Sequence, residues 1–169
     1  MRLHIKNMQK LIREKNHRLP SEAYKGFVAA AFTANILERK HLFVEDTFFQ
    51  VFQEILLDEL RQQHCSSYVY LFMPDHLHII IAGEHDNANV QECMDMFKQR
   101  TGFWLYKNQP LYHWQKDYYD HIIRKDEDMN AQIRYILQNP VRAGLVDSWK
   151  KYPYKGSTKF NFDEWNEQM

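Results

Sequence analysis

Two histidines one residue apart, His76 and His78, are the strongest candidates for chemistry in this chain. They follow a Met-Pro-Asp turn at residues 73–75, between two apolar runs at 68–73 and 76–81. This pattern predicts a hairpin of two strands joined by a tight turn. Because strand side chains alternate between faces, both imidazoles would point to one side and Leu77 to the other. Such a pair suits half of a metal site, and it also suits the solvated face of a half-buried sheet.

Tyr135 and Asn139 lie four residues apart, which makes them neighbours on one side of a predicted third helix. That helix begins at the acidic residues 126–128 and stops near Gln138, before Pro140. Its apolar positions, Met129, Ile133, Ile136 and Leu137, fall on another side. An amide oxygen from Asn139 beside two imidazoles would give an open, three-ligand metal site, and a phenol next to it could act as a nucleophile on a phosphate. The plainer alternative is a tyrosine on the polar flank of an amphipathic helix.

The elements that must position these residues follow a recognisable order. We expect a buried strand at 27–34, a helix from an Asp46 N-cap to Gln63, the hairpin, and a second helix from an Asn89 cap to about Gly102. An extended segment at 114–124 precedes the third helix. This βαββαβ order predicts an α+β, ferredoxin-like antiparallel sheet with helices on one face, plus a C-terminal catalytic helix. The stripe expected to be buried in the first helix is Phe48, Val51, Phe52, Ile55, Leu56 and Leu60.

The amino-acid composition limits the kinds of function that this chain can have. The 169 residues are 44% hydrophobic and 26% charged, as in a globular domain, and 22 basic residues balance 22 acidic ones. That balance argues against nonspecific binding of long duplex DNA, while the 15% aromatic content offers faces on which bases can stack. Two isolated cysteines, Cys65 and Cys93, and an N-terminus without an apolar run predict a cytoplasmic protein with no membrane segment.

Three motifs together resemble the REP-associated tyrosine transposases, within the superfamily of single-tyrosine HUH transposases. They are Met-Pro-Asp-His-Leu-His-Ile-Ile at 73–80, Trp114-Gln115 followed by Tyr-Asp-His-Ile-Ile-Arg at 119–124, and Tyr-Ile-Leu-Gln-Asn-Pro-Val-Arg-Ala-Gly-Leu-Val at 135–146. The motifs occur in family order, and the resemblance spans roughly residues 26–155. We therefore expect an N-terminal arm at 1–25 with one short helix at 8–15, a nuclease domain at 26–155 and a C-terminal tail at 156–169. The tail from Asp147 onwards is expected to lie over the surface.

The resemblance implies a metal-dependent endonuclease and strand transferase that cuts single-stranded DNA near a short, REP-like hairpin. Tyr135 would attack the phosphate and form a 5′-phosphotyrosine link, and His76, His78 and Asn139 would bind Mg²⁺ or Mn²⁺. The resemblance also implies a bacterial, cytoplasmic and nucleoid-associated protein that acts as a monomer or a homodimer. Members of the family tend to be more basic than this chain. Tyr118 and Tyr119 are rival nucleophiles. The expected contacts to DNA are Tyr119, His121, Arg124 and Arg142.

Three other functions fit parts of the sequence. A domesticated protein that binds DNA hairpins without cutting them would keep the fold and lose the chemistry. A nucleotide hydrolase of the histidine-triad type would need a third histidine where this chain has Ile80. A zinc-stabilised fold would need a fourth protein ligand, which is not evident.

Overall fold

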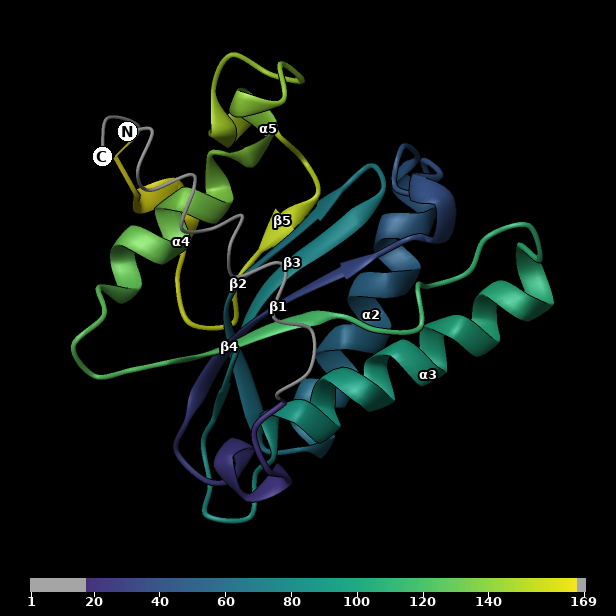
Figure 1. The fold of residues 1–169 in the computed structure, drawn as a ribbon. Coiled ribbons are helices and arrows are strands. Elements are labelled where there is room, and N and C mark those ends of the chain that lie inside the picture. The colour runs from purple at the N-terminus through teal and green to yellow at the C-terminus, as the bar shows by residue number, and fades with distance from the viewer. Residues whose placement is uncertain (1–17, 167–169) are drawn as a thin grey trace.

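The protein is described by a computed structural model, which defines residues 18–166. A five-stranded antiparallel sheet with the order β4-β1-β3-β2-β5 forms its centre (Figure 1). The strands are β1 (Ala29–Asn35), β2 (Cys65–Met73), β3 (His76–Gly83), β4 (Tyr119–Ile123) and β5 (Lys155–Gly156). The helices are α2 (Asp46–Gln62), α3 (Val90–Asn108), α4 (Met129–Leu137) and α5 (Asn139–Arg142). The predicted α+β fold with a ferredoxin-like sheet is confirmed, and the predicted N-terminal helix at 8–15 lies outside the described residues.

The register of the strands fixes which side chains share a face. β3 is central, and His78 pairs with Thr33 of β1 and with Leu71 of β2. On the other side of β1, Thr33 pairs with Tyr119 of β4. Directly opposed residues of antiparallel strands project to the same face, so Tyr119, Thr33 and His78 form one row across three neighbouring strands. In a ferredoxin-like sheet the second strand of the hairpin is central, so the predicted order of elements implied this position of the two histidines, and it is confirmed.

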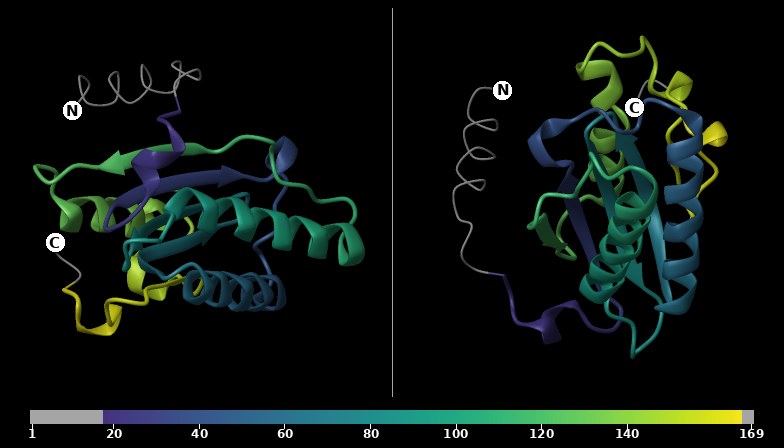
Figure 2. Two further views of the ribbon diagram at one scale, coloured as in Figure 1. Left: turned by 90° about the horizontal axis from the view of Figure 1, so that it is seen from below. Right: turned by 90° about the vertical axis from the view of Figure 1, so that its right-hand side faces the viewer.

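The first face of the sheet packs against α2 and α3, which lie side by side (Figure 2). Leu77, Ile79 and Ile81 of β3 point into this core. The Asn89 side chain caps α3 as predicted, by accepting from the backbone N–H groups of residues 91 and 92. The predicted end near Gly102 is wrong because the buried stripe continues through Thr101 and Leu105, and α3 extends to Asn108.

The predicted cap of α2 is also wrong. Glu45 occupies the N-cap position without a side-chain cap bond, and Asp46 is the first helical residue, whose carboxylate accepts from the Tyr154 hydroxyl. The buried side of α2 is close to the predicted stripe but includes Phe49 at its centre and Phe48 only in part. The helix is therefore rotated slightly toward Phe49, which contacts Phe72 of β2 and Tyr154 edge-on or tilted.

The second face of the sheet carries α4, so the sheet is covered on both sides. Ile133, Ile136 and Leu137 of α4 pack on Ile80 of β3 and on Val69, Leu71 and Met73 of β2. α4 ends at Leu137 as predicted from Pro140, although the short α5 follows at once, with Pro140 near its start where a proline is tolerated. The Asp128 side chain caps α4 by accepting from the backbone N–H of Ala131.

The chain after Asp147 is part of the second core, so the prediction that it lies over the surface is wrong. Trp149, Tyr152 and Phe162 are buried beside α4, and β5 adds to the sheet by pairing with β2. The Tyr152 hydroxyl donates to the backbone oxygen of Phe72 at 2.7 Å. Short 3₁₀ turns complete the described chain at Ser21–Tyr24, Leu37–Arg39, Trp149–Lys151 and Phe162–Glu164.

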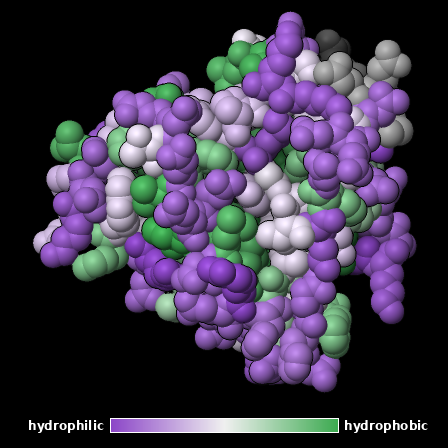
Figure 3. All heavy atoms as spheres, turned by 180° about the vertical axis from the view of Figure 1, so that it is seen from behind, coloured by the Kyte–Doolittle hydropathy of each residue, from purple (hydrophilic) through white to green (hydrophobic). Residues whose placement is uncertain are grey.

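The surface opposite the view of Figure 1 is largely hydrophilic, with apolar groups scattered among polar ones (Figure 3). Among residues 18–166, no helix has the length and apolar composition needed to cross a membrane.

Candidate functional site

His76 and His78 lie at the start of β3 on the face that carries α4, while Leu77 between them points into the core with α2 and α3. The two imidazole rings meet edge to face, and their Nε2 atoms are 3.1 Å apart. Both side chains are partly buried. The predicted alternation of these side chains is therefore confirmed, and the Nε2 atoms of the two rings converge on one point above the sheet.

The opposite nitrogen of each ring is held by a neighbouring side chain. His76 Nδ1 lies 2.6 Å from Asp75 Oδ1, and His78 Nδ1 lies 2.9 Å from Thr33 Oγ1. A carboxylate only accepts, so the hydrogen bond to Asp75 places the proton on Nδ1 of His76 and leaves the lone pair on Nε2. Partners of this kind orient histidine ligands and fix their tautomer in metal sites.

The charge state of the rings suits metal binding as well. Burial lowers the pKa of His76, although the hydrogen bond to Asp75 opposes this effect. Burial, followed by the charges of His76 and Arg142, lowers the pKa of His78 to about 3. Both rings are therefore neutral near pH 7, as ligands must be. Burial alone would raise the pKa of Asp75, but His76 and Arg39 outweigh it and lower that pKa, so this carboxyl is ionised.

Arg39 was not predicted as a site residue, and the structure places it against the histidine turn. Its Nε donates to Asp75 Oδ2 at 2.8 Å, another nitrogen donates to Asn35 Oδ1, and a third lies 3.4 Å from His76 Nδ1. Glu38 and Arg39 both have φ near +57°, at 58° and 56°, a left-handed conformation that is costly for residues of these types. This strain lies in the connection that brings the guanidinium to the turn.

Backbone hydrogen bonds clamp that connection onto the hairpin. The N–H of Ile36 donates to the oxygen of Asp75 at 2.8 Å, and the N–H groups of Leu42 and Phe43 donate to the oxygen of Pro74 at 2.8 and 3.0 Å. Thr33 is a polar residue inside an otherwise apolar strand, and this feature of the sequence could have indicated its role. No pattern could have indicated Arg39, because its position depends on how this loop closes over the turn.

Tyr135, Asn139 and Arg142 form a second group at the end of α4 and the start of α5. The Arg142 guanidinium lies 4.0 Å from the centre of the Tyr135 ring, and it donates to the backbone oxygen of Tyr135 at 2.6 Å and to Asn139 Oδ1 at 2.9 Å. The Asn139 amide also donates to the oxygen of Ile136 at 3.1 Å. The Tyr135 side chain is 49% exposed. The positive charge of Arg142 helps to lower the pKa of His78, so this group lies within electrostatic reach of the histidine pair.

The set of protein side chains that could bind a metal at this site is small. Across residues 18–166, no three His, Cys, Asp or Glu side chains gather in a way that could hold a metal. A third protein ligand beside the two imidazoles would therefore have to be of another type, such as an amide. Asn139 is of this type, and its Oδ1 accepts from Arg142.

The two rival tyrosines lie on opposite faces of the sheet. Tyr118 is buried against α3, contacts Phe32 edge-on and donates its hydroxyl to Asp95 at 2.7 Å. Burial and the bond to Asp95 raise its pKa, which is the wrong direction for a nucleophile. Tyr119 shares the row of Thr33 and His78, and it is 44% exposed. Only Tyr119 of these two projects to the histidine face.

The remaining predicted contacts to DNA follow β4. His121 lies on the histidine face, and its Nε2 is 2.9 Å from the Glu127 carboxylate. The backbone N–H of Arg124 donates to the same carboxylate at 2.9 Å, and this bond is the main reason why the pKa of Glu127 is lowered. The Arg124 side chain is exposed.

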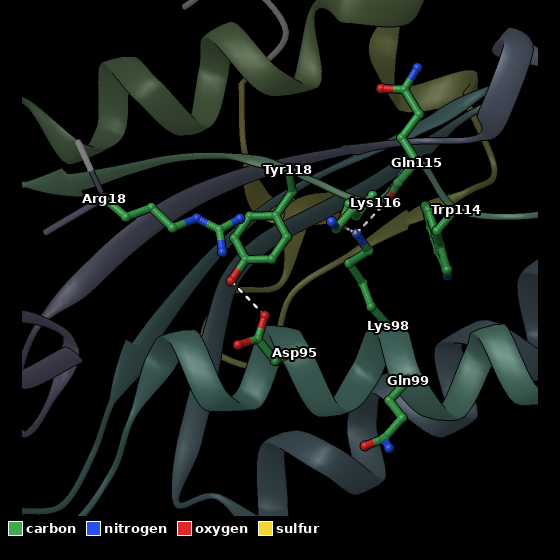
Figure 4. Close-up of a pocket in the computed structure, with 8 residues that line it drawn as sticks. All are labelled: Arg18, Asp95, Lys98, Gln99, Trp114, Gln115, Lys116 and Tyr118. Carbon is green, nitrogen blue, oxygen red and sulfur yellow. Dashed lines mark hydrogen bonds between the residues drawn. The ribbon is translucent and has the colours of Figure 1, made fainter. Parts of the chain in front are cut away.

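A pocket of about 320 Å³ lies on the other face, between α3 and the segment that leads into β4 (Figure 4). Three of its charged groups, Arg18, Asp95 and Lys98, contact the Tyr118 side chain or the backbone. Arg18 lies over the Tyr118 ring at 4.3 Å, and Lys98 Nζ donates to the backbone oxygens of Gln115 and Lys116 at 2.8 and 3.2 Å. This pocket is separated from the histidine pair by the sheet, and its contacts fasten the incoming strand to α3.

Comparisons with known proteins give a consistent result. Residues 30–139, more than half of the chain, match the family model of IS200-like transposases. A Haemophilus influenzae protein named as a candidate REP-associated tyrosine transposase is 26% identical over 114 residues, which cover 55% of this chain and 62% of that protein. The REP-associated tyrosine transposase of Escherichia coli is 26% identical over 124 residues, covering 73% of this chain and 72% of that protein.

A solved structure of a REP-associated tyrosine transposase bound to a REP hairpin has the same fold. It superposes with a TM-score of 0.70 at 21% identity, over 83% of this chain and 81% of that chain. The match to the Haemophilus influenzae protein spans less than two thirds of that protein's length. The resemblance to REP-associated tyrosine transposases carried by the three motifs is confirmed, and the chain belongs to the IS200-like transposase family.

Proposed function

We propose that this chain is a metal-dependent endonuclease and strand transferase that acts on single-stranded DNA beside a hairpin. The observation that carries the proposal is the convergence of the two Nε2 atoms, 3.1 Å apart, on the sheet face covered by the helix that bears Tyr135. His76 and His78 would hold Mg²⁺ or Mn²⁺, with Asn139 as the third protein ligand. Two imidazoles favour Mn²⁺ on ligand type. The bound ion would withdraw charge from the scissile phosphate.

The side chains of the protein carry out the remaining steps. The Tyr135 hydroxyl loses its proton as its oxygen attacks the phosphorus, the bond between phosphorus and the 3′ oxygen breaks, and that oxygen takes up a proton to give a free 3′-hydroxyl. The 5′ phosphate stays on Tyr135 as a phosphotyrosine. In the reverse direction a 3′-hydroxyl attacks this link and releases the tyrosine, which is strand transfer. Arg142, which lies 4.0 Å from the Tyr135 ring, would offset the negative charge that develops on the phosphate.

The partner follows from the same proposal. Tyr119 and His121 of β4, and Arg124 directly after it, would contact unpaired nucleotides next to a REP-like hairpin, since aromatic rings stack on bases and arginine binds phosphates. We place this activity in the bacterial cytoplasm at the nucleoid, carried by a monomer or a homodimer. A domesticated protein that binds the hairpin without cutting it is the alternative that the experiment below separates.

The test uses single-stranded oligonucleotides that carry the hairpins flanking this gene, incubated with Mn²⁺ or Mg²⁺ and resolved on denaturing gels. We expect a covalent protein–DNA adduct with wild type and none with Tyr135→Phe or His78→Ala. Tyr106→Phe is the matched control, because Tyr106 is an exposed tyrosine of α3 on the other side of the sheet. An adduct that survives in Tyr135→Phe and disappears in Tyr119→Phe would reassign the nucleophile. Tight binding without cleavage under either metal would favour the domesticated binder.

A further inference from the structure

A second cavity, of about 410 Å³, lies where β1 begins, β4 ends and α4 starts. This volume is within the range of about 300–1,000 Å³ found for small-molecule sites. Its floor is apolar and is formed by Val28, Ala29, Ile123 and Met129. The proposed function uses one residue of its lining, Arg124, as a contact to DNA.

The rim of the cavity combines an exposed aromatic ring with positive charge. The Phe27 side chain is 72% exposed, and Arg124 and Lys125 are exposed beside it. Among residues 18–166, neither the Arg124 guanidinium nor the Lys125 ammonium takes part in an ion pair. An apolar floor, a free ring face and two available cations suit a ligand that is flat and carries a negative charge.

The lining also holds one carboxylate, Glu127, beside the two cations. Glu127 accepts from His121 Nε2 at 2.9 Å, from the backbone N–H of Arg124 at 2.9 Å and from Gln132 Nε2 at 3.0 Å. Its oxygens are thus committed to organising the turn between β4 and α4. With Arg124 and Lys125 against Glu127, the lining carries one net positive charge.

The cavity opens on the same face of the sheet as the histidine pair. Ala29 pairs with Ile123 as Thr33 pairs with Tyr119, and residues an even number of positions apart on a strand share a face. Four residues along β1 separate Thr33 from Ala29, which is about 13 Å. The partly exposed Tyr119 and His121 lie along β4 between the two places. A strand of DNA held at the histidine pair would reach the cavity by following β4.

We propose that this cavity binds one unpaired nucleotide of the single strand that flanks the hairpin. The base would stack on Phe27 over the apolar floor, and Arg124 and Lys125 would contact its phosphate. The proposal rests on the proposed function, because it assigns to a place in the structure part of the DNA that the enzyme holds while it cuts. Charge complementarity favours this occupant over an apolar segment of protein.

The test measures affinity by fluorescence anisotropy for two DNA hairpins, one with a single-stranded flank and one without, using Tyr135→Phe as the background so that no DNA is cut. In that background, Phe27→Ala should weaken binding of the flanked hairpin about 5- to 100-fold, which corresponds to one base stacked on an aromatic ring. Binding of the unflanked hairpin should stay unchanged. Phe103→Ala is the matched control, because Phe103 is 63% exposed on α3 at the opposite face.

An abasic scan along the flank then identifies the nucleotide. At one position, removal of the base should cost as much affinity as Phe27→Ala, and the two changes together should cost no more than either alone. Lys125→Ala should weaken binding of the flanked hairpin and reduce the salt dependence of that binding. Circular dichroism and thermal melting of each variant exclude misfolding.

Three results would overturn the proposal. Phe27→Ala could match Phe103→Ala on every oligonucleotide, the two hairpins could bind the Tyr135→Phe protein equally, or Phe27→Ala could alter self-association in sedimentation without altering DNA affinity. In each case the proposed nuclease would still stand, because its test is the covalent adduct on Tyr135. Absence of any hairpin binding or adduct would instead overturn the proposed function together with this site.

Discussion

The Arg39 guanidinium donates to the Asp75 carboxylate at 2.8 Å, and the other oxygen of that carboxylate lies 2.6 Å from His76 Nδ1. Arginine, carboxylate and imidazole thus form a chain that ends at the Nε2 atom facing His78. The chain is built across a strained turn, with Glu38 and Arg39 both left-handed. Strain of this kind persists where the surrounding structure enforces it, here through three backbone hydrogen bonds onto Pro74 and Asp75.

Arg39→Ala should release the Asp75 carboxylate and let the His76 ring sample both tautomers and other orientations. In ¹⁵N NMR of the metal-free protein, we expect the Nδ1-protonated form of His76 in wild type and a mixture in the variant. Affinity for Mn²⁺ should fall several-fold. Arg61→Ala removes an exposed arginine of α2 that pairs with Asp58 and should leave both readouts unchanged.

A double-mutant cycle shows whether Arg39 acts through Asp75. Asp75→Ala should weaken Mn²⁺ binding about 10-fold or more, and adding Arg39→Ala should weaken it no further. If Arg39→Ala instead tightens Mn²⁺ binding in the Asp75→Ala protein, the guanidinium acts on the ion by charge alone.

Thr33→Val should disturb His78 in the same way with little change in packing volume, because the hydroxyl lies 2.9 Å from His78 Nδ1. Loss of a hydrogen-bonded partner behind a ligand weakens metal binding about 10- to 100-fold. Calorimetric titration with Mn²⁺ measures this effect. Thr47→Val, on the exposed first turn of α2, is the control and should bind like wild type. Equal affinity in the two variants would show that Thr33 does not orient the ring.

The Met-Pro-Asp turn between two apolar runs was enough to predict the hairpin, and the order of the elements predicted its central place in the sheet. The alternation of His76, Leu77 and His78 predicted the shared face of the imidazoles. Helical spacing predicted that Tyr135 and Asn139 are neighbours, and Arg142 holds both. Local patterns of this kind reflect the geometry of one element. The relation of Asn139 to the histidine pair depends on how two elements pack, and its place as a ligand stays a prediction.

Features set by distant parts of the chain were missed. Gly102 was expected to end α3, yet Leu105 continues the buried stripe because β1 and β3 provide a surface for a longer helix. Trp149, Tyr152 and Phe162 were expected at the surface, yet they fill the side of α4 that the sheet leaves open. Burial of aromatic residues in a polar segment is decided by such partners, which no local pattern reveals.

Phe162→Ala tests the role of the tail in the second core. Phe162 is buried and contacts Trp149 edge-on, so the change should lower the free energy of unfolding by about 3 kcal/mol or more. Urea unfolding followed by tryptophan fluorescence measures the loss. Phe103→Ala, at an exposed position, should cost less than about 0.5 kcal/mol. A loss near zero for Phe162→Ala would support the predicted boundary of the domain at residue 155.

Stability should depend on pH through His78. Its pKa in the folded protein is lowered to about 3 by burial, whereas an unfolded histidine has a pKa of about 6.5. Between these values the unfolded chain binds a proton that the folded protein does not, so the free energy of unfolding falls as the pH falls below 6.5 and is unaffected above it. Lowering the pH from 6.5 to 5 should cost about 2 kcal/mol more in wild type than in His78→Gln. Urea unfolding at both pH values gives the comparison, and parallel losses in the two proteins would contradict the shift.

Arg142 should position Tyr135 as well as supply charge, since it stacks at 4.0 Å on the ring and bonds to both Tyr135 and Asn139. Arg142→Ala should slow formation of the covalent adduct in single-turnover assays about 10- to 100-fold, the cost of a misplaced reacting group. Arg142→Lys keeps the charge but loses the planar fork, so its rate should stay low while its affinity for the hairpin recovers. A lysine variant with the wild-type rate would mean that charge near the phosphate is all that Arg142 provides.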